Sequence, residues 1–192
     1  MSESETHQRI IAAAIRCFVH FGVRKSAMAD IAEEAGVSRQ TLYDAFGSKD
    51  ALIRAAIRAI TTQAIANIER RWASSKGLAD QLDVFLDETV VRSFDLLQTA
   101  RDPDDLISGH NAAGADAIAE SHARHGTLMT TVLARHSDTL RAQGLTPEQF
   151  AHYVVSVAMG FKYVKDRSEL MRLMAALRAS VIATVGESPT PH

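Results

Sequence analysis

The residues at 39–43 have side chains that can recognise the edges of nucleic-acid bases. Arg39 carries the paired donors that fit guanine, and Gln40 has the donor and acceptor that fit adenine. Thr41 and Tyr43 add hydroxyl groups one turn or less away. We therefore expect these four residues to contact bases. A phosphate contact is the alternative role for Arg39.

A second set of polar side chains is suited to phosphate oxygens. Hydroxyl and ammonium groups bind phosphates without reading sequence, so they fix the position of a protein on a duplex. The expected phosphate contacts are Ser26, Ser38, Thr41, Tyr43 and Lys49.

Two short helical patterns must position these side chains. Residues 27–35 have apolar residues at three- and four-residue spacing, which predicts one buried face. Gly36 permits a tight exit from this helix, and Ser38 can cap the next one, residues 39–46, through its hydroxyl. In that second helix Leu42 and Phe46 point inward. The arrangement predicts a helix-turn-helix, whose second helix enters the major groove of DNA.

The segment from Asp30 to Lys49 resembles the DNA-binding signature of the tetracycline-repressor (TetR/AcrR) family of bacterial transcription regulators. It reads D-I-A-x-x-A-G-V-S-x-x-T-L-Y-x-x-F-x-S-K, and the similarity extends over about the first 58 residues. In this family Tyr43 and Lys49 occupy backbone-contacting positions. The resemblance implies a homodimer on a palindromic operator, with a small apolar or amphipathic effector that releases a repressor.

Three residues depart from the family pattern. Asp44 stands where an aromatic or basic residue is common, and it requires a cytosine amino group or a nearby arginine as its partner. Ala27 and Ala29 replace a threonine and a polar or basic residue. Ser26 is therefore expected to cap the first helix of the motif, and one base contact is lost.

Composition favours an all-helical, soluble and cytoplasmic protein. The 192 residues are 46% hydrophobic, with four prolines, and no apolar segment approaches the ~18 residues of a membrane span. The single cysteine, Cys17, excludes an internal disulfide and lies on an apolar stripe, which predicts burial. Residues 7–58 contain eight Lys or Arg against five Asp or Glu, so the basic excess coincides with the motif.

The helical patterns predict two domains and about nine helices. Residues 1–58 form the three-helix DNA-binding domain, and residues 59–192 form the effector-binding and dimerisation domain. One long helix, from residue 49 to about residue 72, crosses the boundary. We expect fraying at residues 1–6, a loop at residues 110–114 and disorder at residues 187–192. The last two helices have extra apolar residues, Val155, Met171 and Ile182, which suit a second helical partner.

A histidine-bearing helix face is the candidate for effector recognition. Buried imidazoles need hydrogen-bond partners, so histidines in an apolar stripe indicate a cavity that orients a ligand. The expected pocket residues are Phe85, Thr89, His110, Ile118, His122, His125, Met129 and Phe161. Ordinary satisfied or exposed histidines are one alternative. The other is a metal on His122 and His125, completed by His136, His152, His110 or a carboxylate.

The function expected from these patterns is regulation of transcription without catalysis or a cofactor. An enzyme that uses the histidines is disfavoured, because Glu120, Ser121 and His122 are neighbours on one helix and diverge. An activator of the same fold and a metal-responsive regulator stay open as alternatives.

Overall fold

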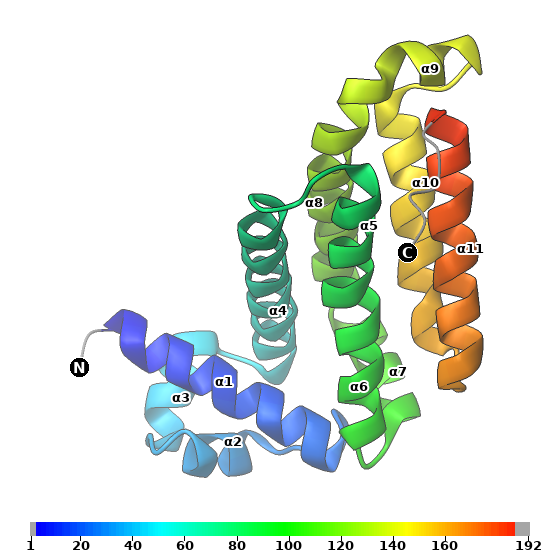
Figure 1. Ribbon diagram of the computed structural model, residues 1–192. Coiled ribbons are helices and arrows are strands. Elements are labelled where there is room, and N and C mark those ends of the chain that lie inside the picture. Colours follow the sequence, from blue (N-terminus) through cyan, green and yellow to red (C-terminus); the bar gives the residue numbers. More distant parts are fainter. Residues whose placement is uncertain (1–2, 187–192) are drawn as a thin grey trace. The chain divides into compact units, whose positions relative to one another are not determined.

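A computed structural model describes residues 3–186, except for the side chains of residues 108–112 (Figure 1). Every regular element in that range is a helix, which confirms the expected all-α class. The α-helices are α1 (Glu3–Phe21), α2 (Met28–Glu34), α3 (Arg39–Phe46), α4 (Lys49–Trp72), α5 (Leu78–Leu86), α6 (Arg92–Thr99), α7 (Pro103–Ala113), α8 (Ala115–Leu133), α9 (Ser137–Ala142), α10 (Pro147–Gly160) and α11 (Arg167–Val185). Within these described residues, no helix combines the length and apolarity that crossing a membrane requires.

The chain divides into two compact units. The first contains Met1–Thr62 and Asp95–Ser121, and the second contains Gln63–Phe94 and His122–His192. The chain passes between the units inside α4, α6 and α8. Residues 95–121 thus join the N-terminal unit, although the sequence grouped them with the C-terminal part. The division of function at residue 58 stays a prediction.

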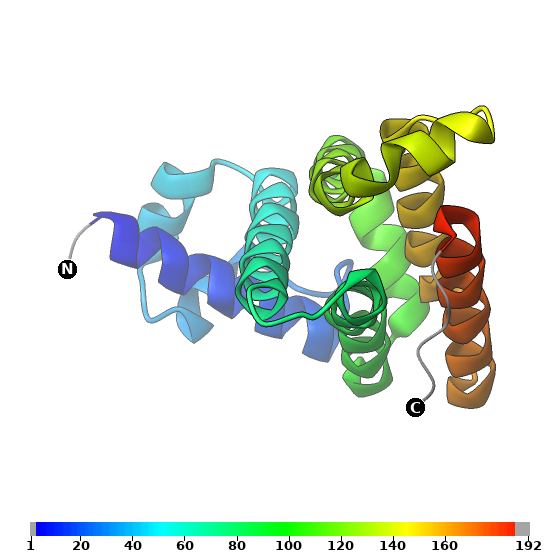
Figure 2. The ribbon, with the colours of Figure 1, turned by 45° about the horizontal axis from the view of Figure 1, so that its top comes forward.

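The core of the first unit forms where α1 packs against α2, and α2 against α3 (Figure 2). Apolar residues at helical spacing explain this core, because each helix buries one stripe and leaves its polar residues in water. Cys17 is buried there, as its position on the stripe of α1 predicted. The largest buried side chains of this core are Ile10, Phe18, Ile31, Leu42, Leu52 and Ile53.

The core of the second unit is formed by α5, α8, α10 and α11 with the end of α4. Helices α10 and α11 lie side by side, and α11 also contacts α5 (Figure 1). Thr146 and Gln149 form a capping box at the start of α10, and Asp166 accepts from the Glu169 backbone N–H at the start of α11. The largest buried side chains are Ile68, Leu82, Phe85, Met129, Leu133 and Leu140.

The structure corrects several expected boundaries. α1 begins at Glu3, so residues 3–6 are helical and not frayed. The expected loop at residues 110–114 is wrong, because the backbone of α7 stays helical to Ala113. Between α7 and Gly144 the chain forms α8, a 3₁₀ turn (Ala134–His136) and α9. Residues 187–192, where we expected disorder, lie outside the described residues.

A π-helical turn, Asp87–Val91, separates α5 from α6 and contains a buried acid. The Glu88 side chain is 1% exposed, and it forms ion pairs with Arg71 at 2.7 Å and with Arg92 at 2.9 Å. Asn67 also donates to Glu88, at 3.2 Å. These bonds satisfy a charge that would otherwise be costly to bury. They hold the second half of α4 against the turn.

Removing the buried carboxylate with Glu88→Ala is expected to lower the free energy of unfolding by about 2 kcal/mol. Asp87→Ala is the matched control, because Asp87 pairs with the same Arg71 but its side chain is 43% exposed. Exposed pairs contribute little, so this control should change stability by no more than about 1 kcal/mol. Urea unfolding measures both changes. Equal destabilisation by the two variants would contradict the assignment.

Candidate nucleic-acid interface

A tight turn joins α2 to α3 as the sequence predicted. Gly36 has φ +62°, a left-handed conformation that favours glycine, and the Val37 N–H donates to Ala32 O at 3.0 Å. Ser38 is the N-cap of α3, and its hydroxyl accepts from the Thr41 N–H at 3.0 Å. The turn therefore fixes the direction in which α3 leaves α2.

The two sides of α3 have opposite character. Leu42 is completely buried and anchors the helix to the core of the first unit. Arg39, Gln40, Thr41 and Tyr43 are all exposed, and Tyr43 keeps 48% of its surface in solvent. The four expected base contacts are therefore accessible on one short helix. Their contacts with DNA stay a prediction.

Hydrogen bonds within α3 orient two of these side chains. The Gln40 amide donates to Asp44 Oδ1 at 2.7 Å, so glutamine is the partner of the unusual acid at position 44. The hydroxyls of Ser38 and Thr41 lie 2.8 Å apart and share a hydrogen bond. A base or phosphate that used these donors would have to replace the existing bonds.

Ser26 does not cap α2, which corrects the expectation from the sequence. The N-cap of α2 is Ala27, whose N–H donates to the Asp30 carboxylate at 3.2 Å. Ser26 is buried, and its hydroxyl donates to the carbonyls of Gly22 at 2.7 Å and Cys17 at 3.1 Å. Because the hydroxyl is enclosed and used by the backbone, we leave Ser26 out of the proposed phosphate contacts.

Lys49 lies beside the loop between α1 and α2. Its ammonium donates to Arg24 O at 3.2 Å. Desolvation by burial lowers the pKa of Lys49, while the charges of Asp105 and Asp50 oppose this shift. Arg24 itself is exposed and forms an ion pair with Asp105 of α7. Two cations, one in the α1–α2 loop and one at the start of α4, are thus held together.

The sequence did not identify Asp105 as part of this interface. Asp105 lies 81 residues from Arg24, and in the sequence it is one of three acids in the segment Asp102–Asp105. Helical periodicity predicts which face is buried, but not which distant element covers a loop. The contact of the Asp105 carboxylate with Arg24 is therefore visible only in the structure.

Most of the expected effector residues are packed in the core of the second unit. Thr89 donates to Phe85 O at 2.6 Å, and the rings of Phe85 and His125 meet edge to face with centroids 6.0 Å apart. Buried members of the set are Phe85, Thr89, His125, Met129 and Phe161. Ile118 packs in the first unit instead, and the His110 side chain lies outside the described residues. An effector site at this set stays a prediction.

His122 is half-buried, and its surroundings disfavour its charged form. Burial lowers the pKa of His122, and the charges of Lys162 and His152 lower it further. This shift favours the neutral imidazole, which has one donor and one acceptor for a polar partner. No group of three His, Cys, Asp or Glu with metal-binding geometry occurs where side chains are described, that is in residues 3–107 and 113–186.

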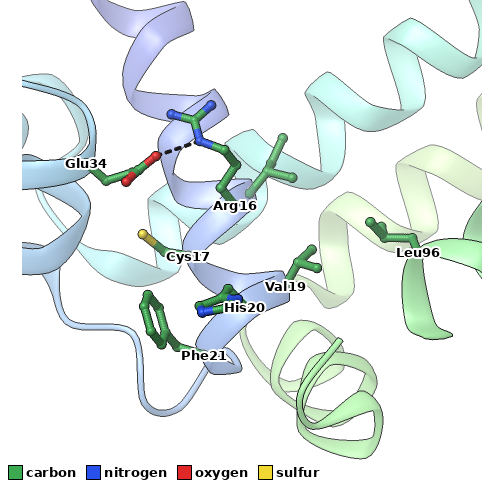
Figure 3. A pocket seen from close by; sticks show the side chains of 8 residues that line it. Arg16, Cys17, Val19, His20, Phe21, Glu34 and Leu96 are labelled. Atoms are coloured by element: carbon green, nitrogen blue, oxygen red, sulfur yellow. Dashed lines mark hydrogen bonds and ion pairs between the residues drawn. The ribbon is translucent and has the colours of Figure 1, made fainter. Parts of the chain in front are cut away.

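An open pocket of about 470 Å³ lies along α1, at a place that the sequence did not suggest (Figure 3). Ile15, Val19 and Leu96 provide apolar surface, and the pair of His20 and Phe21 meets edge to face. Arg16 and Glu34 form a 2.7 Å ion pair at its side. Cys17 contributes to the lining, although only 3% of the residue is exposed.

The Cys17 thiol is expected to react slowly with Ellman's reagent in the native protein. Burial raises the pKa of Cys17, and the charges of Glu34 and Asp30 raise it further. Little thiolate is therefore present at pH 7, and the thiolate is the reactive form. Absorbance at neutral pH measures the rate, and urea should increase it by orders of magnitude to that of a free thiol. A native rate equal to the unfolded rate would contradict the burial.

The turn after α2 and the exposed polar side of α3 define a helix-turn-helix domain, and a larger helical unit accompanies it. Residues 10–56 match the family described as "Bacterial regulatory proteins, tetR family". This segment of the chain therefore matches the DNA-binding part of the tetR family, as the motif predicted. This is a family of transcription regulators and not of enzymes.

Curated relatives match part of the chain. The uncharacterised HTH-type transcriptional regulator YvdT of Bacillus subtilis is 33% identical over 86 residues, which are 45% of this chain and 44% of YvdT. The HTH-type transcriptional regulator TtgR of Pseudomonas putida is 47% identical over 51 residues, 27% of this chain and 24% of TtgR. This chain thus spans less than half the length of each relative.

Solved structures match nearly the whole fold. A Rhodococcus protein assigned to the TetR-family regulators has a TM-score of 0.71 at 20% identity, covering 95% of this chain and 100% of that one. Salmonella enterica GusR has a TM-score of 0.68 at 21% identity, covering 96% of this chain and 97% of GusR. At these identities the similarity establishes the fold of the second unit and not its ligand.

Proposed function

We propose that the protein is a sequence-specific DNA-binding repressor that a small molecule releases from its operator. The observation that carries this proposal is the exposed side of α3, where four polar side chains face solvent while Leu42 anchors the helix. A recognition helix needs this division, because its inner side must be rigid and its outer side free to enter the groove.

In the proposed complex, α3 lies in the major groove with Arg39 and Gln40 at the base edges. Arg39 reads guanine through its paired donors. Gln40 reads adenine after exchanging its bond to Asp44 for the base. Ser38, Thr41, Tyr43 and Lys49 contact phosphates on the two sides of the helix.

A homodimer is part of the proposal, because two recognition helices are needed to read a palindrome in successive major grooves. Met171 and Leu173 on α11 and Tyr153 on α10 are large apolar residues that are exposed in one chain. A dimer would cover them. The other two residues expected at the interface, Val155 and Ile182, are buried within the second unit and do not support it.

The effector is proposed to bind within the second unit and to be apolar or amphipathic. That unit has a mostly apolar interior with His122 and His125 among its few polar groups. An effector that prefers one conformation of this unit would shift the population of α4 conformations and so the spacing of the recognition helices. The continuity of α4 from residue 49 to residue 72 supports this link.

Footprinting on the DNA upstream of its own gene and its neighbours tests this proposal. The expected result is two protected regions centred about 10 base pairs apart, on a sequence with two-fold symmetry. Protection of a single half-site would contradict the dimer, and absence of protection on all these fragments would contradict local regulation. In vitro transcription from a protected promoter should fall as protein is added; a rise would identify an activator.

A further inference from the structure

We propose that Asp105 is a positioning residue for DNA binding, which holds Arg24 and Lys49 in the geometry that contacts a phosphate. This inference rests on the proposed function, because it needs a DNA backbone at the first unit. It adds a carboxylate from α7, outside the helix-turn-helix, to the elements that determine affinity.

The Asp105 carboxylate is attached to the α1–α2 loop at two points. Oδ2 accepts from the Arg24 backbone N–H at 3.0 Å, and Oδ1 pairs with the Arg24 guanidinium. The Asp105 side chain is 3% exposed, whereas that of Arg24 is 76% exposed. The acid is therefore enclosed, while most of the guanidinium faces solvent and retains donors for another anion.

Lys49 is joined to the same point of the loop. Its ammonium donates to the carbonyl of Arg24, so one residue connects the buried acid to the first residue of α4. Asp105 also acts on Lys49 through its charge, which favours the protonated form of the lysine. A fixed loop thus presents two positive groups together, which costs less entropy on binding than ordering two free side chains.

The backbone around the loop is shaped to admit the carboxylate. Gly22 has φ +88°, and a Cβ at this position would lie 2.5 Å from Asp105 Oδ2. At the other end, Asp102 Oδ1 accepts from the Asp105 N–H at 3.0 Å and so fixes the first turn of α7. The close approach therefore depends on a glycine in the loop and on an anchored acid in the helix.

The sign of the effect on DNA binding distinguishes positioning from competition. A carboxylate near DNA repels phosphates, so an acid that only occupied Arg24 would weaken binding. An acid that holds two cations in place strengthens binding, provided that its own charge is neutralised and enclosed. The burial of Asp105 and the exposure of Arg24 favour the second case.

A double-mutant cycle with Asp105→Ala and Arg24→Ala tests the proposal on a duplex that contains the footprinted site. Asp105→Ala is expected to weaken binding on the order of tenfold, and to reduce the slope of log Kd against log salt by about one phosphate contact. In the Arg24→Ala background, the same change should cost clearly less, because only the backbone bond to the loop and the position of Lys49 are left to lose. Asp105→Asn, which keeps an acceptor for the loop, should recover part of the affinity.

Three outcomes would overturn the proposal. They are tighter binding by Asp105→Ala, an equal loss with and without Arg24, and the same loss from Asp104→Ala, the matched change at an exposed neighbour in α7. Thermal unfolding of each variant shows whether its loss of DNA affinity results only from lower stability.

Hydrogen exchange of residues 22–26 separates this inference from the proposed function. Asp105→Asn should speed exchange in this loop whether or not DNA is bound, because Arg24 loses its charged partner. If the wild-type protein binds no specific DNA but the loop responds in this way, the proposed function fails and the positioning of the loop is still supported. Unchanged exchange would refute the positioning itself.

Discussion

Leu42→Ala is expected to abolish specific DNA binding, although Leu42 does not touch DNA. Leu42 is completely buried beneath α3, and removing its side chain leaves a cavity that costs about 2–5 kcal/mol. A short recognition helix depends on this contact, because helices of eight residues are not stable alone. Circular dichroism and DNA titration of the same sample measure the loss of structure and of binding.

A matched control for Leu42→Ala is Leu96→Ala in the first unit. Leu96 is 37% exposed, so its truncation should leave both the unfolding temperature and DNA binding near the wild-type values. If Leu42→Ala bound DNA with unchanged affinity and stability, the anchoring of α3 by this residue would be wrong.

Arg39→Ala is expected to weaken operator binding by about 1–3 kcal/mol per half-site, roughly 5- to 150-fold, and to relax preference at one base pair. Stability should not change, because Arg39 is exposed. Competition binding against a set of single-base operator variants measures the preference.

Arg141→Ala is the control for the loss of one positive charge. Arg141 is an exposed arginine of α9 that pairs only with Asp138 among the ion pairs described for it. This change should leave the preference of the protein intact. If Arg39→Ala weakened binding to every duplex equally, Arg39 would be a phosphate contact, which is the alternative role that its position allows.

The helix-turn-helix was predictable because its determinants are local. Gly36, Ser38 and Leu42 act on backbone and side chains within a few residues, so their spacing predicts the turn, the cap and the buried side of α3. The family match over residues 10–56 confirms this part. Local rules wrongly predicted Ser26 as the cap of α2. Its hydroxyl donates instead to two backbone carbonyls that lie four and nine residues earlier in the chain.

The long-range features were not predictable in this way. The contact of Asp105 with Arg24 joins α7 to a loop 81 residues earlier. The helical spacing of apolar residues cannot predict such a long-range pair. Periodicity correctly indicated burial of Phe85 and Met129, but burial in a packed core and burial around a ligand give the same stripe. The open pocket beside Cys17 also depends on Leu96, which belongs to another segment of the first unit.

The most direct test of the central claim is a titration of the purified protein with its own upstream DNA and with a scrambled duplex of equal length and composition. At physiological salt, we expect the upstream DNA to bind at least 10³-fold more tightly than the scrambled duplex. Over a series of salt concentrations, the affinities of the two duplexes should show the same salt dependence. Equal affinity for the two duplexes at every salt concentration would contradict sequence-specific regulation by α3.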